Sequence, residues 1–186
     1  DPSGVEVALF SAGGSRSKEY APKFAAAGGV VIDNSSAFRQ DPNVPLVVAQ
    51  VNDAAVKGHQ GIVATPNCTT MVLMMAAGPL HHAAGLSRMT ATSYQSVSGS
   101  GQTGIEVLTH ELDILSKDRE ALTQGGWSDP NSDLYSRPIG FNVLAHAGSF
   151  TEQGYTDEEW KLVHETRKIL AAPGIEVEPT CVRVPV

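Results

Sequence analysis

Residues 5–15 have the sequence VEVALFSAGGS, and this stretch decides the fold. Its first six residues form a short apolar run that is typical of a buried strand, and the small residues after it predict a loop at the strand's end. A helix is expected from about Ser17 to Ala27, ended by the glycines that follow. Further short strands are expected at residues 30–32, 46–51 and 61–64. This alternation of strands and helices predicts a parallel α/β sheet.

The chain changes character after residue 87. A long strand is expected at 89–97, and the next helix has apolar residues at helical spacing from 105 to 115. The segment 125–141 is rich in Gly, Asp, Asn, Ser and Pro, which is typical of a loop. Thr156-x-x-Glu159 is a capping box, which predicts a helix from there to about Ala171, and a last strand is expected at 175–186. We therefore expect a parallel α/β part in residues 1–87 and an α+β part with antiparallel strands in residues 88–186.

Composition excludes several classes of protein. The 186 residues carry 13 Lys and Arg against 20 Asp and Glu, a net charge of −7, whereas a nucleic-acid-binding protein needs a basic surface. The longest apolar run, Met71–Leu80, is far short of the ~20 residues of a membrane helix. Two cysteines make no disulfide framework and no export signal is visible, so we expect a cytoplasmic protein without nucleic-acid or membrane partners.

Cys68 is the first candidate for chemistry. It follows Pro66-Asn67 at a predicted helix start, and that helix is expected to carry Met71, Val72, Met74 and Met75 on an apolar face. Unpaired N–H groups and the positive end of the helix dipole stabilise a thiolate, which is the nucleophilic form of cysteine. On this pattern alone, a small buried hydrophobic cysteine is an equally open interpretation.

A second motif, GSGQTG at residues 99–104, formally fits the dinucleotide fingerprint G-x-G-x-x-G. The acidic residue that should end a second strand about 20 positions further on is missing, because Asp118 and Glu120 continue a helical pattern. We therefore do not take it as the principal dinucleotide fingerprint, and a plain strand-to-helix turn is the alternative.

Charged residues supply further candidates. Arg39 ends the polar loop SSAFR, which follows a predicted strand, and ligands of open α/β sheets bind at the carboxyl ends of strands. A guanidinium with neighbouring hydroxyls suits a phosphate. Glu158 and Lys161 share a helix face, and Arg183 alternates with apolar neighbours. Solvated surface charges remain the alternative for all of them. The six histidines show no metal-ligand spacing, so no metal site is expected.

Six blocks of sequence are informative together. They are FSAGGS at 10–15, IDNSSAFR at 32–39, PNCTT at 66–70, YQSVSGSG at 94–101, FNV at 141–143 and CVRVPV at 181–186. In this order, and over nearly the whole chain, they resemble the aspartate-semialdehyde dehydrogenase family.

The resemblance implies an oxidoreductase of amino-acid biosynthesis. The family reduces aspartyl phosphate to aspartate semialdehyde with NADPH and releases phosphate, in the synthesis of lysine through diaminopimelate and of threonine, methionine and isoleucine. It implies that residues 1–87 are the C-terminal part of a Rossmann-type NADP-binding domain carrying the nucleophile. Residues 88–186 would be part of an α+β substrate and dimerisation domain, so a homodimer is expected.

The resemblance also assigns roles to single residues. Cys68 is implied to be the nucleophile, whose thiolate displaces phosphate and forms an acyl-thioester. Five residues are implied to bind the substrate: Arg39, Gln95, Glu158, Lys161 and Arg183. Among them Arg39 and Lys161 would contact the phosphate, and Arg183 would clamp the substrate carboxylate. Gln95 would position the substrate and the thioester. Six residues are implied to contact NADP: Ser11, Ala12, Gly13, Asn67, Ser98 and Gly99.

Two features of the family have no counterpart in these residues: its N-terminal dinucleotide fingerprint and the acid/base histidine that follows its RVPV block. The chain also begins and ends in strand-like runs. We therefore expect an internal fragment of a longer enzyme, inactive by itself. N-acetyl-glutamyl-phosphate reductase and glyceraldehyde-phosphate-type enzymes use the same thioester chemistry and stay open as alternatives. A cysteine hydrolase and a non-catalytic dimer-forming protein are alternatives from other classes.

Overall fold

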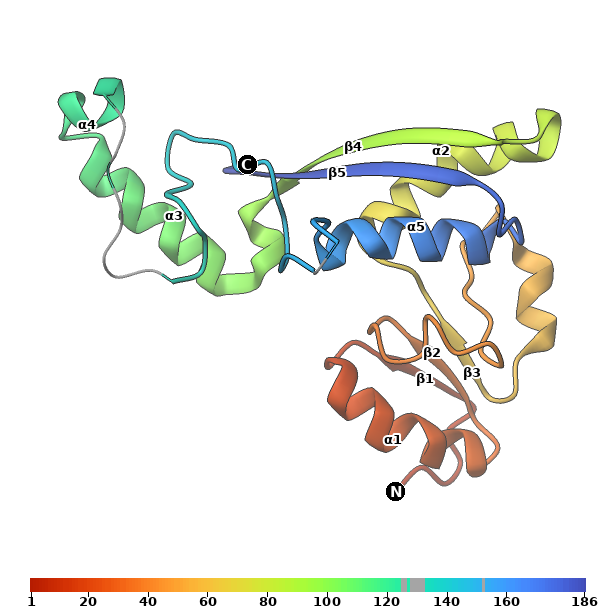
Figure 1. The fold of residues 1–186 in the computed structure, drawn as a ribbon. Helices are drawn as coiled ribbons and strands as arrows, with labels where there is room; N and C mark the ends of the chain where they lie inside the picture. Colours follow the sequence, from red (N-terminus) through yellow and green to blue (C-terminus); the bar gives the residue numbers. More distant parts are fainter. Residues whose placement is uncertain (125–126, 128–132, 152) are drawn as a thin grey trace. The chain divides into compact units, whose positions relative to one another are not determined.

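The computed structural model describes residues 1–124, 127, 133–151 and 153–186. The chain divides into two compact units (Figure 1). Unit 1 comprises residues 1–90 and 160–178, and unit 2 comprises residues 91–159 and 179–186. The division after residue 87 that the sequence favours stays a proposal.

Unit 1 contains a parallel sheet of three strands in the order β1 (Val7–Phe10), β2 (Val30–Asp33), β3 (Ile62–Ala64). Helix α1 (Gly14–Ala26) connects β1 to β2, the short helix η1 (Asp53–Gly58) precedes β3, and helix α2 (Cys68–Ala84) follows it. The predicted parallel α/β sheet is confirmed. In the register of the sheet, Phe10 pairs with Asp33 and Asp33 with Ala64. Because all three strands end in one row, the loops that follow them leave the sheet at the same edge.

Three expectations for unit 1 are wrong. The run expected to be a buried strand forms β1, but Val7 is 60% exposed and Leu9 is 80% exposed. Residues 46–51 form no strand; only Leu46 pairs, in an isolated bridge with Ala64. Leu46, Val48 and Val51 of this segment are nevertheless buried in one cluster with Met74 and Ala77 of α2, so the pattern reflected burial rather than sheet pairing. On α2 itself, Met74 is buried, while Val72 and Met75 are exposed, so the four residues expected on one apolar face do not share one environment.

Two long strands, β4 (Arg88–Ser96) and β5 (Glu176–Val184), pair in a sheet of their own. The N–H of Glu176 donates to Ser87 O at their starts, and Arg183 Nη1 donates to Ser96 O at their ends, so the strands run in the same direction (Figure 1). This differs from the expected antiparallel arrangement. Parallel strands require a long crossover connection, and here the connection carries further helices. An antiparallel pairing occurs in the isolated bridge between Leu144 and Arg183.

The crossover contains the short helix η2 (Val97–Ser100), then α3 (Gly101–Leu115), α4 (Arg119–Gln124) and α5 (Asp157–Ile169). The predicted capping box at the start of α5 is confirmed, because Glu159 N–H donates to Thr156 Oγ1 and Thr156 N–H donates to a carboxylate oxygen of Glu159. The expected loop at 125–141 lies partly outside the described residues.

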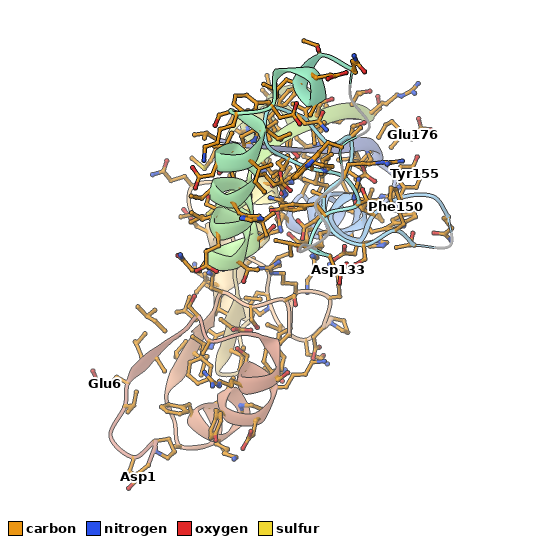
Figure 2. All side chains as sticks on the ribbon, turned by 90° about the vertical axis from the view of Figure 1, so that its left-hand side faces the viewer. Asp1, Glu6, Asp133, Phe150, Tyr155 and Glu176 are labelled. Carbon is orange, nitrogen blue, oxygen red and sulfur yellow. The ribbon has the colours of Figure 1, made fainter. Side chains whose placement is uncertain are left out.

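Each unit has a core of buried apolar side chains. Figure 2 draws the side chains of the described residues on the ribbon. In unit 1 the last residue of α5, Ile169, and the following Leu170 pack in one cluster with Met74 of α2 and with Leu46. In unit 2 Val97, Leu108, Ile139 and Leu144 form a smaller cluster. Among the described residues, no helix is long and apolar enough to cross a membrane.

Candidate active site

Three loops meet at the carboxyl edge of the unit 1 sheet: residues 11–13 after β1, 34–39 after β2 and 65–67 after β3. This edge is where ligands of open α/β sheets bind. The buried carboxylate of Asp33 organises the first two loops. It accepts hydrogen bonds from Ser17 Oγ of α1 (2.7 Å) and from Ser35 Oγ (2.8 Å) and N–H (3.1 Å). The start of α1 and the loop after β2 are therefore held by one side chain.

Cys68 lies at the third loop and is the first residue of the seventeen-residue helix α2. The helix start that the sequence predicted is confirmed. Asn67 is the N-cap, and its Oδ1 accepts the N–H of Thr69 at 2.9 Å. The thiol is exposed, with its Sγ 3.9 Å from Asn67 Oδ1 and 4.0 Å from Thr69 Oγ1. The alternative of a buried hydrophobic cysteine does not apply, because Cys181, not Cys68, is the buried one.

Arg39 connects the second loop to the third. Its guanidinium is buried and donates from Nε to Thr65 O (2.9 Å) and from Nη2 to Asn34 O (3.0 Å). Thr65 Oγ1 adds a bond of 2.8 Å to Asn34 Oδ1. Arg39 is therefore not a solvated surface charge, and much of its donor capacity already holds the backbone next to Cys68.

A buried carboxylate that the sequence analysis did not identify completes this arrangement. Glu165 of α5 accepts from Arg39 Nη1 at 3.3 Å and from the backbone N–H of Asn67 at 2.7 Å. Its side chain is 1% exposed. Burial raises the pKa of Glu165 above its usual 4.5, while the Arg39 charge and the Asn67 N–H act in the opposite direction. The sequence did contain a signal: Glu165 lies three residues after Leu162 and four before Ile169, both buried, so it shares their face of the helix.

A second residue of α5 holds the continuation of the loop after β2. Lys168 Nζ donates to three backbone carbonyls, those of Arg39 (2.8 Å), Asp41 (2.6 Å) and Val44 (2.8 Å). Partial burial of the ammonium lowers the pKa of Lys168. Helix α5 therefore fixes both ends of the segment that Arg39 begins.

The loop after β1 contains Ser11, Ala12 and Gly13, which the sequence analysis expects to contact the cofactor. Gly13 is the N-cap of α1 at a φ of 88°, a left-handed conformation that favours glycine. The N-cap makes no side-chain hydrogen bond, and no acidic residue lies in the first turn of α1. This loop lies close to the one after β2, since a Cβ on Gly14 would be 3.8 Å from Ser36 Oγ.

In unit 2, two of the expected substrate-binding residues line one cavity of about 260 Å³. They are Arg183 of β5 and Glu158 of α5. Arg183 is buried and donates from Nη1 to Ser96 O at 2.8 Å. A Cβ on Gly99 would lie 2.8 Å from the same nitrogen, so the short helix η2 sits tightly on the guanidinium. The cavity therefore presents a positive and a negative side chain in one place.

The structure also places three further residues that the sequence analysis expects at the site. Gln95 is near the end of β4 and donates from Nε2 to Ser93 Oγ at 3.0 Å. Ser98 belongs to η2, and its N–H and Oγ both contact Ser96 Oγ. Lys161 lies on α5 one turn after Glu158 and belongs to unit 1.

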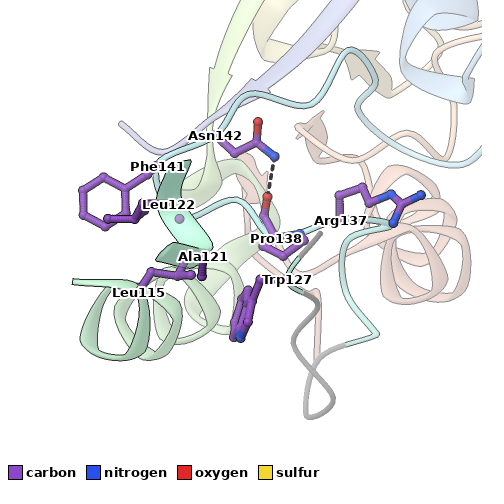
Figure 3. A pocket seen from close by; sticks show the side chains of 9 residues that line it. Leu115, Ala121, Leu122, Trp127, Arg137, Pro138, Phe141 and Asn142 are labelled. Carbon is purple, nitrogen blue, oxygen red and sulfur yellow. Dashed lines mark hydrogen bonds between the residues drawn. The ribbon is translucent and has the colours of Figure 1, made fainter. Parts of the chain in front are cut away.

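A further cavity in unit 2 has a volume of about 330 Å³ and is lined largely by apolar side chains, among them Leu122, Trp127 and Phe141 (Figure 3). None of the expected site residues lines it. Among the described residues, no group of three or more His, Cys, Asp and Glu side chains is arranged to hold a metal ion.

The glycines of the motif at 99–104 have packing reasons of their own. Gly101 begins α3 at a φ of 74°, and Gly104 lies against Val97 O and the Tyr135 hydroxyl, where a Cβ would not fit. The motif lies in unit 2, where it connects β4 to α3.

The sheet and its edge define the class of protein: an α/β protein of the dinucleotide-binding type with an exposed cysteine at a helix start. Models of two families match it in succession. Residues 1–59 match "Semialdehyde dehydrogenase, NAD binding domain", and residues 78–186 match "Semialdehyde dehydrogenase, dimerisation domain". The chain belongs to the semialdehyde dehydrogenase family, and its N-terminal part is a nicotinamide-dinucleotide-binding domain.

Similar proteins carry the name aspartate-semialdehyde dehydrogenase. The one from Streptomyces akiyoshiensis is 51% identical over 100% of this chain and 56% of its own length. The one from Corynebacterium glutamicum is 50% identical over 98% of this chain and 54% of its own. The crystal structure of aspartate semialdehyde dehydrogenase II from Vibrio cholerae superimposes with a TM-score of 0.90 at 44% identity, over 100% of this chain and 53% of that one. The chain therefore spans about half the length of the relatives it matches.

Proposed function

We propose that the complete polypeptide carrying this sequence is an NADP-dependent aspartate-semialdehyde dehydrogenase. It would reduce aspartyl phosphate to aspartate semialdehyde and release phosphate, for the synthesis of lysine, threonine, methionine and isoleucine. Identity of about half of all residues to relatives of that name supports the substrate class. A V. cholerae relative of 44% identity has been crystallised as a complex with ASA, which supports a small-molecule substrate.

The observation that carries the proposal is the position of Cys68. It is exposed, it is the first residue of α2, and it stands at the edge of the sheet where three loops meet. The dipole of α2 favours the thiolate there. Attack of the thiolate on the acyl carbon of aspartyl phosphate forms a C–S bond and breaks the C–O bond to phosphate, which leaves with the electron pair. When bound, the reduced nicotinamide supplies the hydride that converts the thioester to the aldehyde.

The residues of this chain have distinct proposed tasks. Ser11, Ala12 and Gly13 would hold part of the cofactor on the N–H groups at the start of α1, together with Asn67, Ser98 and Gly99. Arg183 and Glu158 suit an amino acid, because a guanidinium pairs with its carboxylate and a carboxylate with its ammonium.

Three further residues would act on the acyl phosphate and the thioester. Gln95 would position the acyl group. Arg39 and Lys161 would attract the phosphate, and Arg39 retains N–H groups beyond the three bonds described above for that contact.

The assembly and the location are part of the same proposal. The family model for residues 78–186 is that of a dimerisation domain, which supports a homodimer formed through the residues after 87. The cytoplasmic location expected from the sequence stays a prediction, as does inactivity of the 186 residues by themselves.

The test is the phosphate- and NADP-dependent oxidation of aspartate semialdehyde by the complete polypeptide. Replacement of Cys68 by Ser should lower kcat by more than about 10³-fold, as removal of a nucleophile does. Intact turnover in Cys68→Ser would refute the proposal. Preference for N-acetyl-glutamyl or glyceraldehyde substrates would favour the related reductases, and ester hydrolysis without NADP would favour a hydrolase.

A further inference from the structure

We propose that Glu165 is a positioning residue for Cys68, acting through the backbone of Asn67 and the guanidinium of Arg39. The inference rests on the proposed function, because it concerns the same nucleophile. The contacts are direct: one carboxylate oxygen accepts the Asn67 N–H at 2.7 Å, and the other accepts Arg39 Nη1 at 3.3 Å.

The bond to Asn67 fixes the residue that determines where α2 starts. Asn67 is the N-cap, and the next residue in the chain is the nucleophile. A peptide N–H at the N-cap position has no i→i−4 acceptor within the helix, and the Glu165 carboxylate supplies one. Since Asn67 Oδ1 also caps Thr69, a rotation at Asn67 would displace the first turn of α2 and the Cys68 thiol with it.

The bond to Arg39 fixes the same loop from the other side. Arg39 Nε holds Thr65 O, three residues before Cys68, while Nη2 holds Asn34 O after β2. Glu165 thus orients the guanidinium of Arg39, which itself holds the segment 65–67 through its bond to Thr65 O. The segment 65–67 is therefore held at both ends: at Asn67 by Glu165 of α5, and at Thr65 by Arg39 of the loop after β2.

A purely architectural role predicts a different outcome from a positioning role. If Glu165 only holds the fold together, its replacement lowers stability but leaves the reactivity of folded molecules unchanged. If it positions Cys68, folded molecules react more slowly. Displacement of a reacting group by about 1 Å can cost about 100-fold in rate.

Glu165→Gln is the most informative variant. It keeps the shape of the side chain. Because Arg39 and Asn67 donate to different carboxylate oxygens, Oε1 and Oε2, an amide in the same place presents its NH2 group to one of the two donors and loses that bond. Glu165→Asp keeps the charge and withdraws the carboxylate by one methylene, and it replaces the Gln variant if that one does not fold. The matched control is Glu111→Gln, since Glu111 is equally buried and its Oε2 accepts the N–H groups of Ile139 and Gly140 in unit 2.

Two quantities are measured on the complete polypeptide, below the melting temperature of each variant. One is the rate of Cys68 alkylation by iodoacetamide, followed on the peptide that contains Cys68. The other is the pair kcat and KM for aspartate semialdehyde. We expect Glu165→Gln to lower the alkylation rate and kcat by about 10- to 100-fold with KM changed less than about threefold, and Glu111→Gln to change neither rate.

Unchanged alkylation and kcat in folded Glu165→Gln would overturn the inference, as would an equal loss in Glu111→Gln. This outcome is distinguishable from failure of the proposed function. That function fails if Cys68→Ser retains turnover, whereas the inference fails if Cys68→Ser is inactive and Glu165→Gln is as active as the parent.

Discussion

Replacement of Lys168 by Met tests how strongly α5 holds the loop that begins at Arg39. The ammonium donates to three carbonyl oxygens within 2.6–2.8 Å, from residues 39, 41 and 44. Methionine keeps an unbranched stem of similar length, so the apolar packing is largely retained while the three donors are lost.

The size of the effect follows from these contacts. A hydrogen bond from a charged group contributes about 1.5–3 kcal/mol, but the three bonds here share one partly buried ammonium, and burying a charge costs free energy. The contributions therefore do not add in full, and we expect a loss of about 2–4 kcal/mol.

The assay is urea unfolding of the complete polypeptide, with Lys23→Met as the matched control. Lys23 is exposed and lies 3.6 Å from Glu19 on the same helix, so its removal should cost less than about 1 kcal/mol. If the two variants lose the same free energy of unfolding, the three carbonyl contacts of Lys168 do not stabilise the fold and the reasoning is refuted.

Three further outcomes are expected. Burial raises the pKa of Glu165, so the folded chain keeps that proton to higher pH than the unfolded chain. The stabilisation that comes from this retained proton is complete below pH 4.5 and is lost as the pH rises through the pKa of Glu165 in the folded chain. The free energy of unfolding of Glu165→Gln, measured over the same pH range, should not show this decline. Gly99→Ala places a Cβ against Arg183 Nη1 and should raise KM for aspartate semialdehyde about 10-fold with little change in kcat. The control is Gly58→Ala, where the space around the added Cβ is open and neither constant should change. Equal KM values in the two variants would argue against the proposed role of Arg183. Thr156→Ala removes the acceptor for the Glu159 N–H and should cost about 1 kcal/mol in urea unfolding, and no loss would show that the capping bond is not stabilising.

Local patterns in the sequence were sufficient to predict those parts of the site whose residues are close to one another in the chain. The apolar run before residue 11 and the Pro-Asn pair before Cys68 predict a strand end and a helix start, and both are present. These features depend on residues within a few positions of one another. The segment 46–51 shows the limit: alternating burial looks alike in a strand and in an irregular segment packed on a helix, because periodicity reports burial and not hydrogen bonding.

The contacts of Glu165 with Asn67 and Arg39, which hold the backbone next to Cys68, could not be predicted from local patterns. Glu165 lies 98 residues from Asn67 and 126 from Arg39 in the chain, and no local pattern encodes such a contact. The parallel direction of β4 and β5 is a similar case, because it depends on the path of a long connection and not on the strands themselves.

The support of Cys68 is polar because the backbone that it holds is polar. Thr65 O, Asn34 O and the Asn67 N–H each need a partner, and apolar side chains of the same volume would leave all three unpaired. A buried ion pair by itself often stabilises a fold no more than well-packed apolar residues do, whereas removal of one partner leaves an uncompensated buried charge. The contribution of Arg39 and Glu165 therefore lies in the geometry that they impose on two loops. Their effects on the reactivity of Cys68 should consequently be non-additive: once Glu165 is replaced, a change at Arg39 should cost less alkylation rate than it does in the parent.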